Sequence, residues 1–254
     1  MKSIIDLTDK RILIIGASSG IGKQCAITLS QVGAKVILAA RREDKLREVL
    51  ELLEGDGHGI KAMDVQDTDN IEKCVKEIIN EFGALDGMVY SAGVGTAIPL
   101  LQTKPEKIKQ VFDINFFGFT EAVRQICRRG RYNPGMRIVG ISSVASIRGD
   151  KSKTAYSSSK SAMDSAIRCI AREMADKDIC INSVAPSMTA TELYDRYIEK
   201  YGEDSDTNQD LLKRQYLGIA KTDDIANAVA FLLSPAARFI TGITLPVDGG
   251  LTTC

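Results

Sequence analysis

Two side chains four residues apart could carry out a proton transfer in this chain. Tyr156 and Lys160 lie in the run AYSSSK, and a four-residue step places them one turn apart on one face of a helix. A phenol with a pKa of about 10 is a poor acid–base catalyst at neutral pH, but a nearby cation stabilises the phenolate and lowers that pKa. A surface tyrosine and lysine on a serine-rich helix would show the same spacing, so the pair must be judged with its surroundings.

Two hydroxyl groups precede this pair. The apolar run 138–141 predicts a strand that ends at Ser142 and Ser143. A serine hydroxyl at the end of a strand can donate a hydrogen bond to a carbonyl oxygen on which negative charge develops. Together with Tyr156 and Lys160, such a serine gives a set of side chains suited to proton transfer at a carbonyl group.

A glycine-rich turn near the N-terminus predicts a nucleotide site. The run KRILIIGASSGIG is a strand that leads into Gly16, Gly20 and Gly22, with Ser18, Ser19 and Ile21 between them, and then into a helix. Glycine permits the tight turn and the close approach of a pyrophosphate, while the start of the helix offers free N–H groups and a positive dipole. The spacing is Gly-x-x-x-Gly-x-Gly, and the alternative is an ordinary strand–helix turn.

Two arginines after the second strand favour NADP(H) over NAD(H). An acidic residue at this place would accept hydrogen bonds from a ribose 2′-hydroxyl and repel a 2′-phosphate, whereas Arg41 and Arg42 suit the phosphate. The alternative is a pair of solvated arginines at the start of a helix. Asp64, after the third strand, could accept from an adenine amino group or could cap the turn.

Apolar runs alternate with amphipathic segments along the chain. The pattern predicts a single-domain α/β fold over 1–254, a doubly wound parallel sheet with helices on both faces. The expected strands are 11–15, 35–40, 59–63, 87–90, 136–141, 179–184 and 243–246. The expected helices are 20–32, 43–53, 68–82, 104–129, 155–176 and 222–233. The polar segment 191–217 lies outside this alternation, and it is either a lid over the site or an exposed helix pair.

Composition excludes several classes of protein. The chain has 254 residues, of which 44% are hydrophobic and 26% charged, and its 33 basic residues balance 33 acidic ones, so no nucleic-acid or membrane partner is expected. No apolar run is long enough to span a membrane, and we expect a cytoplasmic protein. Six scattered cysteines and a single histidine argue against a metal site and for reduced cysteines that serve as small core residues.

Taken together, the motifs resemble the short-chain dehydrogenase/reductase family over essentially the whole chain. The resemblance rests on the glycine turn, Asp64-Val65, Ser91-Ala92-Gly93, Asn115, Ser143, Tyr156-x-x-x-Lys160, Asn182-x-Val-x-Pro186 and Val247-Asp248-Gly249-Gly250. Three positions depart from the usual pattern: Ile15 replaces a threonine, Ser91 an asparagine and Ser187 a glycine.

The resemblance implies a role for each matching residue. Tyr156 would be the general acid in carbonyl reduction, Lys160 would lower its pKa and hold the nicotinamide ribose, Ser143 would orient the carbonyl, and Asn115 would hold a water of a proton relay to Lys160. The implied cofactor site comprises Gly16, Ser18, Ser19, Gly20, Ile21, Gly22, Arg41, Arg42, Asp64, Val65, Ala92, Gly93, Tyr156, Lys160, Pro186, Met188, Thr189 and Thr191.

The substrate is the property that the sequence determines least. The general pattern is similar to that of 3-oxoacyl-carrier-protein reductases and their relatives that act on sugars, polyols, steroids or small ketones. Arg128, Arg129, Arg131 and Arg172 could form a basic face for an acidic carrier protein, or could simply complement helix ends. A sensor that binds NADP without catalysis is a remote alternative. In related proteins the helices matching 104–129 and 155–176 pair across subunits, which implies a homotetramer or homodimer.

Overall fold

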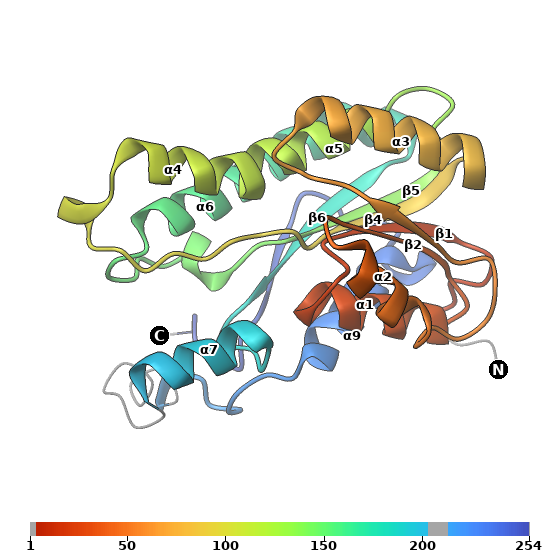
Figure 1. The fold of residues 1–254 in the computed structure, drawn as a ribbon. Helices are drawn as coiled ribbons and strands as arrows, with labels where there is room; N and C mark the ends of the chain where they lie inside the picture. Colours follow the sequence, from red (N-terminus) through yellow and green to blue (C-terminus); the bar gives the residue numbers. More distant parts are fainter. Residues whose placement is uncertain (1–3, 203–212, 254) are drawn as a thin grey trace.

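The computed structural model describes residues 4–202 and 213–253 and contains a seven-stranded parallel sheet (Figure 1). The spatial order of the strands is β3-β2-β1-β4-β5-β6-β7. Their bounds are β1 Arg11–Ile15, β2 Lys35–Ala40, β3 Gly59–Ala62, β4 Leu85–Tyr90, β5 Tyr132–Ile141, β6 Cys180–Pro186 and β7 Thr244–Val247. The predicted doubly wound fold is therefore confirmed.

Helices cover both faces of the sheet (Figure 1). One layer holds α3 (Thr68–Phe82), α4 (Pro105–Phe112), α5 (Gly118–Ile126) and α6 (Thr154–Met174); the other holds α1 (Gly20–Gln31), α2 (Glu43–Leu50) and α9 (Thr222–Leu233). A further helix, α7 (Glu192–Tyr201), lies at the margin of the second layer. No helix among the described residues is both long enough and apolar enough to cross a membrane.

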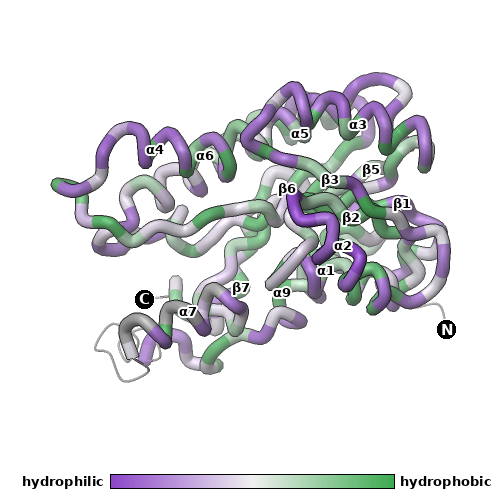
Figure 2. Tube along the Cα trace, in the orientation of Figure 1, coloured by the Kyte–Doolittle hydropathy of each residue, from purple (hydrophilic) through white to green (hydrophobic). Residues whose placement is uncertain are grey.

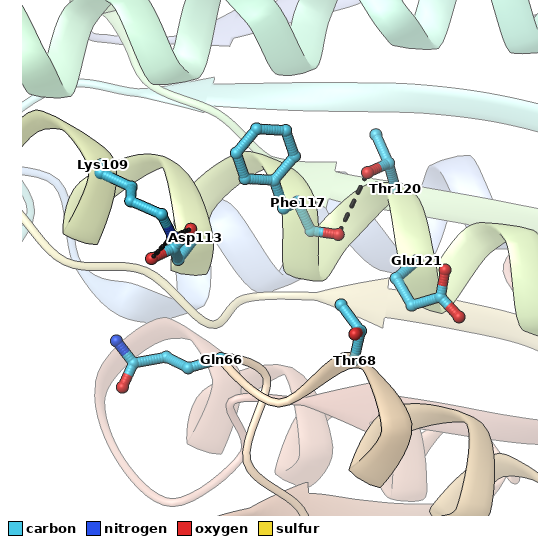
Figure 3. A pocket seen from close by; sticks show the side chains of 7 residues that line it. All are labelled: Gln66, Thr68, Lys109, Asp113, Phe117, Thr120 and Glu121. Atoms are coloured by element: carbon cyan, nitrogen blue, oxygen red, sulfur yellow. Dashed lines mark hydrogen bonds and ion pairs between the residues drawn. The ribbon is translucent and has the colours of Figure 1, made fainter.

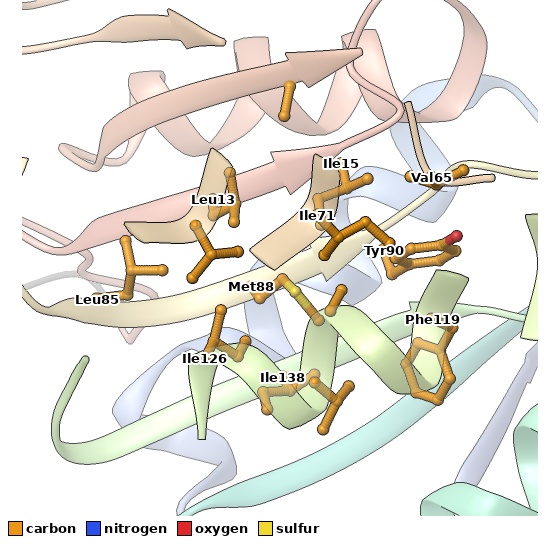
Figure 4. Close-up of a cluster of buried hydrophobic side chains, with 14 of the residues drawn as sticks. Leu13, Ile15, Val65, Ile71, Leu85, Met88, Tyr90, Phe119, Ile126 and Ile138 are labelled. Atoms are coloured by element: carbon orange, nitrogen blue, oxygen red, sulfur yellow. The ribbon is translucent and has the colours of Figure 1, made fainter. Parts of the chain in front are cut away.

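The strands are apolar along their whole length because both of their faces are buried. On β1, Ile12 and Ile14 enter the core beneath α1 and α9, whereas Leu13 and Ile15 enter the core beneath α3 and α5. Figure 4 shows the second of these cores, in which Leu13, Ile15 and Met88 lie side by side. Alternate side chains of one strand thus hold both helix layers. Along the outer helices α3 and α5, hydrophilic and hydrophobic residues alternate, as expected of helices that cover a sheet with one face (Figure 2).

Several predicted boundaries are wrong. The helix expected over 104–129 ends at Ile126 and is interrupted by a π-helical turn, Asp113–Phe117, between α4 and α5. Strand β5 begins at Tyr132 rather than 136, and its pairing with β4 shifts register between Leu85 and Gly87. These features depend on tertiary pairing, so local periodicity does not reveal them.

The segment 191–217 is described at its two ends. Helix α7 occupies its first part, residues 203–212 lie outside the described residues, and Gln215 near its end is fully buried. The cysteine prediction is right for Cys25, Cys74 and Cys180, which are buried, and wrong for Cys169, which is exposed on α6.

The strand order reverses between β1 and β4, and we call the region at the carboxyl ends of these two strands the crevice. The chain winds outward through β2 and β3, then returns to place β4 on the other side of β1. Ligands of such sheets bind beyond the carboxyl ends of the strands at this reversal. Here the backbone N–H of Ser91 donates to Ile15 O at 2.8 Å, so the segments that follow β1 and β4 are joined at the crevice.

Gly118 lets α5 approach the sheet closely. A Cβ at this position would lie 2.5 Å from Tyr90 Oη and 2.8 Å from Val65 O. The Tyr90 hydroxyl is fully buried and donates to Ile114 O at 2.6 Å, and thereby ties the π-helical turn to β4. Gly118 is therefore a packing residue on which the position of Asn115 depends.

We predict that Gly118→Ala lowers the free energy of unfolding by about 1–3 kcal/mol, because the overlap outweighs the roughly 1 kcal/mol that alanine gains in a helix. Urea denaturation measures the change. Gly149→Ala is the matched control, since its Cβ would meet nothing within 4 Å, and it should change stability by less than about 0.5 kcal/mol. Equal stability of the two variants would contradict this account of the packing.

Candidate active site

Ser143 lies just beyond the carboxyl end of β5, where it caps a short 3₁₀ turn. Its Oγ accepts a hydrogen bond from Ala145 N at 3.1 Å, which fixes the orientation of the hydroxyl. The side chain is only partly buried. Ser143 can therefore present a hydroxyl to a ligand at the crevice without losing its own support.

Tyr156 in the first turn of α6 is brought to Ser143. The two side chains share a hydrogen bond, which favours the phenolate, but burial of the ring is the larger effect and raises the Tyr156 pKa. The predicted effect of Lys160 on this pKa stays a prediction.

Lys160 follows one turn later and is almost fully buried, with 4% of its surface exposed. Its Nζ donates to Ile141 O at 2.6 Å. Burial lowers the pKa of the ammonium group to about 8, and the carboxylate of Asp164 acts in the opposite direction. Burial of a charged lysine costs folding free energy, so its presence at this position points to a role other than stability.

Asp164 is a site residue that motif reasoning missed. It is 5% exposed and accepts hydrogen bonds from Ser142 Oγ at 2.8 Å and from Ser183 Oγ at 2.7 Å. Its carboxylate thereby joins the end of β5 to the middle of β6, one helical turn after Lys160. The available signal was an acidic residue one helical turn after the lysine, Lys160-x-x-x-Asp164.

Asn115 lies in the π-helical turn and binds protein groups on two elements. Its Oδ1 accepts from Val94 N at 2.9 Å, and its Nδ2 donates to Val94 O at 3.1 Å and Ser159 Oγ at 2.9 Å. Ser159 in turn donates to Tyr156 O at 2.7 Å. The side chain thus connects the loop after β4 to the turn of α6 that carries Tyr156, a role that the sequence did not predict.

Gly93 brings the loop and the lysine together. A Cβ on Gly93 would lie 3.4 Å from both Asn115 Oδ1 and Lys160 Nζ. The main chain after β4 therefore runs directly past the ammonium group.

The glycine turn is built for close backbone contact. A Cβ on Gly16 would lie 2.4 Å from Ala92 N, and one on Gly22 would lie 2.2 Å from Gly16 O, so neither position admits a side chain. Gly20 has φ +53° and leads into α1, and its Cβ position lies in van der Waals contact with Thr191 Cγ2, at 3.5 Å, and 3.6 Å from Glu192 Oε2. These residues fit a dinucleotide, because glycines at the start of α1 let a pyrophosphate approach the free N–H groups of the helix.

The arginines after β2 lie beside this turn. Arg42 donates to Ser18 Oγ at 3.3 Å, so an exposed guanidinium and a hydroxyl meet at the end of β2. Arg41 is exposed. One carboxylate oxygen of Asp64 accepts from Gln66 N at 3.0 Å, which matches the capping alternative, and Val65 is buried against Gly118.

The residues after β6 complete the crevice. Pro186 ends the strand, and Met188, Thr189 and Thr191 follow it toward α7, with Thr191 as the residue that caps this helix. The departure at Ser91 is accommodated tightly, since a Cβ on Gly22 would lie 3.1 Å from its Oγ. Ser187 donates to Gln215 Oε1 at 2.8 Å.

A groove of about 430 Å³ lies outside this set of residues (Figure 3). It runs between Gln66 in the loop after β3 and Thr68 at the start of α3 on one side, and α4, the π-helical turn and α5 on the other. Its charged side chains are paired within the chain, Lys109 with Asp113 and Glu121 with Arg124. We assign the chemistry to the crevice, where the acid, the lysine and the glycine turn converge.

We predict that Lys160→Met changes the pH dependence of stability. The pKa of Lys160 is about 8 in the folded protein and 10.5 when unperturbed, so the unfolded state holds the proton longer and the native wild type gains stability as pH rises between these values. At about 1.4 kcal/mol per unit, the free energy of unfolding of wild type should rise by about 2 to 3 kcal/mol relative to the variant over this window. Chemical denaturation at a series of pH values measures the difference, and a flat difference would contradict the buried charge.

Comparison with known proteins gives a consistent result. Residues 16–252 match a family model described as enoyl-(acyl carrier protein) reductase. The chain is 35% identical to the L-xylulose reductase of Caenorhabditis elegans, with 99% of both chains covered. It is 34% identical to the 3-oxoacyl-[acyl-carrier-protein] reductase of Rickettsia prowazekii, with 98% of this chain and 99% of the relative covered.

A solved structure shows the same fold. A dehydrogenase/reductase from Sinorhizobium meliloti superposes with a TM-score of 0.89 at 29% identity, covering 98% of this chain and 97% of that one. With the family model spanning nearly the whole chain and the serine, tyrosine and lysine gathered at the crevice, the chain belongs to the short-chain dehydrogenase/reductase family, whose members are oxidoreductases that use a nicotinamide cofactor.

Proposed function

We propose that the protein is an NADP(H)-dependent reductase that interconverts a carbonyl compound and a secondary alcohol. The observation that carries this proposal is that the fold brings the hydroxyls of Ser143 and Tyr156 together, with the buried Lys160 one turn further along α6.

Each residue has a step in this reaction. Ser143 donates a hydrogen bond to the carbonyl oxygen and orients it, and Tyr156 gives that oxygen a proton as it becomes an alkoxide. Lys160 holds its charge beside Gly93, where it would bind ribose hydroxyls and favour the phenolate left after proton transfer. Asn115 positions the loop and α6. The nicotinamide, when bound, supplies the hydride.

The preference for NADP(H) is supported by the pairing of Arg42 with Ser18. A guanidinium and a hydroxyl together match the oxygens of a 2′-phosphate, and Arg41 adds a second exposed cation. No residue from Lys35 to Arg42 is acidic, and the first carboxylate after β2 is that of Glu43 at the start of α2. The position that would bind a ribose 2′-hydroxyl therefore has no carboxylate acceptor.

For the substrate, the chain favours a small hydroxylated ketone over a carrier-bound 3-oxoacyl thioester. Arg128 is 3.8 Å from Glu72, and Arg131 donates to Gln125 at 2.7 Å, so half of the predicted basic face is engaged within the chain. Close to Ser143 and Tyr156, Arg148 and Lys153 share the carboxylate of Asp150 and make the loop polar. The relative named L-xylulose reductase is named for a sugar.

The remaining proposals concern the state of the protein. We infer a homotetramer or homodimer, since Phe112, Phe116 and Phe117 cluster on the outer helices and Phe117 is 47% exposed. A cytoplasmic location is proposed separately, from the composition of the chain.

The alternative of a non-catalytic NADP sensor predicts cofactor binding without turnover. Oxidation of NADPH at 340 nm with keto-sugars, acetoacetyl thioesters, diketones and steroids separates these functions.

We predict that Tyr156→Phe lowers kcat by about 10²- to 10⁴-fold, because the carbonyl oxygen loses its proton donor, while the Kd for NADPH stays within about twofold. Tyr132→Phe is the control, since this tyrosine lies at the other end of β5 and should keep the wild-type rate. Turnover by Tyr156→Phe at the wild-type rate would remove the proposed mechanism.

We also predict that Arg42→Ala raises the Kd for NADPH by about 10- to 100-fold and that for NADH by less than about twofold, because only NADPH carries the 2′-phosphate. Fluorescence titration measures both constants. Arg47→Ala is the control, because Arg47 lies in α2, which begins directly after Arg42, and pairs with Glu43. This variant should leave both constants unchanged. A wild-type preference for NADH would reject the NADP(H) proposal.

A further inference from the structure

The two ends of the segment 191–217 are fastened together beside the crevice. Thr189 and Ala220 form a parallel β-bridge, Ala190 N donates to Ala220 O at 2.8 Å, and Ala220 N donates to Met188 O at 3.2 Å. The chain therefore leaves the sheet after β6, runs through α7, and returns to its own starting point before α9. This base is fixed by backbone pairing.

A buried glutamine completes the base. Gln215 is 1% exposed and lies among groups from both ends of the segment. Its Nε2 donates to Met188 O at 3.0 Å and to Gly218 O at 2.6 Å, and its Oε1 accepts from Ser187 Oγ at 2.8 Å. Both N–H donors and the carbonyl oxygen of the amide are thus satisfied, so the side chain has one defined orientation.

The surroundings leave Gln215 little freedom to move. A Cβ on Gly249 would lie 2.9 Å from Gln215 Cγ, so the stem of the glutamine is packed against the turn after β7. The Ser187 hydroxyl, which stands where the family usually has glycine, is the partner that fixes the amide oxygen. The serine and the glutamine therefore act as a pair.

This pair determines where the cofactor-facing loop lies. Met188 is held directly by Gln215, and Thr191 lies three residues further on, with its Cγ2 in contact with the Cβ position of Gly20 at 3.5 Å. The 187–191 loop therefore packs against the glycine turn. A shift of this loop would change its contact with the start of α1, where we expect the pyrophosphate to bind.

We propose that Gln215, acting through Ser187 and Met188, is a positioning residue that holds the 187–191 loop against the glycine turn, where the dinucleotide is expected to bind. The role rests on the proposed nicotinamide dinucleotide site. Because the loop is already ordered before the cofactor binds, binding loses no conformational entropy in ordering it. Removal of the pair should therefore weaken cofactor affinity and leave the chemical step largely unchanged.

The test compares Gln215→Leu with Gln125→Leu. Gln125 is equally buried and is hydrogen-bonded to Glu121 and Arg131, but it lies on α5, away from the loop. We expect Gln215→Leu to raise the Kd for NADPH by about 10-fold or more, from the loss of hydrogen bonds worth about a factor of five each, and to raise KM for NADPH more than it lowers kcat. Gln125→Leu should leave the Kd within about twofold.

Variants at Ser187 provide a second route if Gln215→Leu fails to fold. Ser187→Ala should raise the Kd about fivefold, whereas Ser187→Thr, which keeps the hydroxyl, should restore wild-type binding. Hydrogen exchange without cofactor gives an independent readout: the amides of Ala190 and Ala220 should exchange faster in Gln215→Leu and Ser187→Ala than in wild type.

Two results would overturn the proposal. One is a wild-type Kd in both Gln215→Leu and Ser187→Ala; the other is equal weakening of binding in Gln125→Leu, which would show a general effect of stability. Failure of the proposed function looks different, because wild-type protein would then bind neither NADPH nor NADH while the exchange difference at Ala190 and Ala220 persisted.

Discussion

The crevice exists because the chain after β1 and the chain after β4 touch without a side chain between them. Gly16 lies so close to Ala92 that a Cβ would be 2.4 Å from its backbone nitrogen, and Gly22 lies equally close to Gly16. Any larger residue would separate the two strand ends or push α1 away from the sheet. The turn, the start of α1 and the loop that passes Lys160 are all positioned by this contact.

The second constraint is a charge held out of water. Lys160 donates to Ile141 O and is attracted by the carboxylate of Asp164, which accepts hydrogen bonds from Ser142, just after β5, and from Ser183 of β6. Burial opposes the ammonium form, and these partners offset only part of that cost. The protein thus accepts lower stability in order to present a cation and a phenol at one place, as functional sites commonly do.

The polar side chains of the site do two kinds of work. Ser143 and Tyr156 face the crevice and are free to act on a ligand, whereas Asn115 and Gln215 use their amides on the protein itself. Each of these amides joins a loop at the crevice to another segment of the chain. Where the family pattern changes, as at Ser187, the new polar group is hydrogen-bonded by such a contact rather than left unpaired.

The sequence by itself determined the alternation of strands and helices, the glycine turn, and the serine, tyrosine and lysine of the site, because each depends on local spacing or on residue type. Only the tertiary structure showed that α4 and α5 are separated by a π-helical turn, that Asp164 supports Lys160, and that burial raises the pKa of Tyr156. It also revealed Gln215, whose partners lie up to 28 residues away along the chain. Such contacts depend on which segments the fold brings together, and no local pattern in the sequence records them.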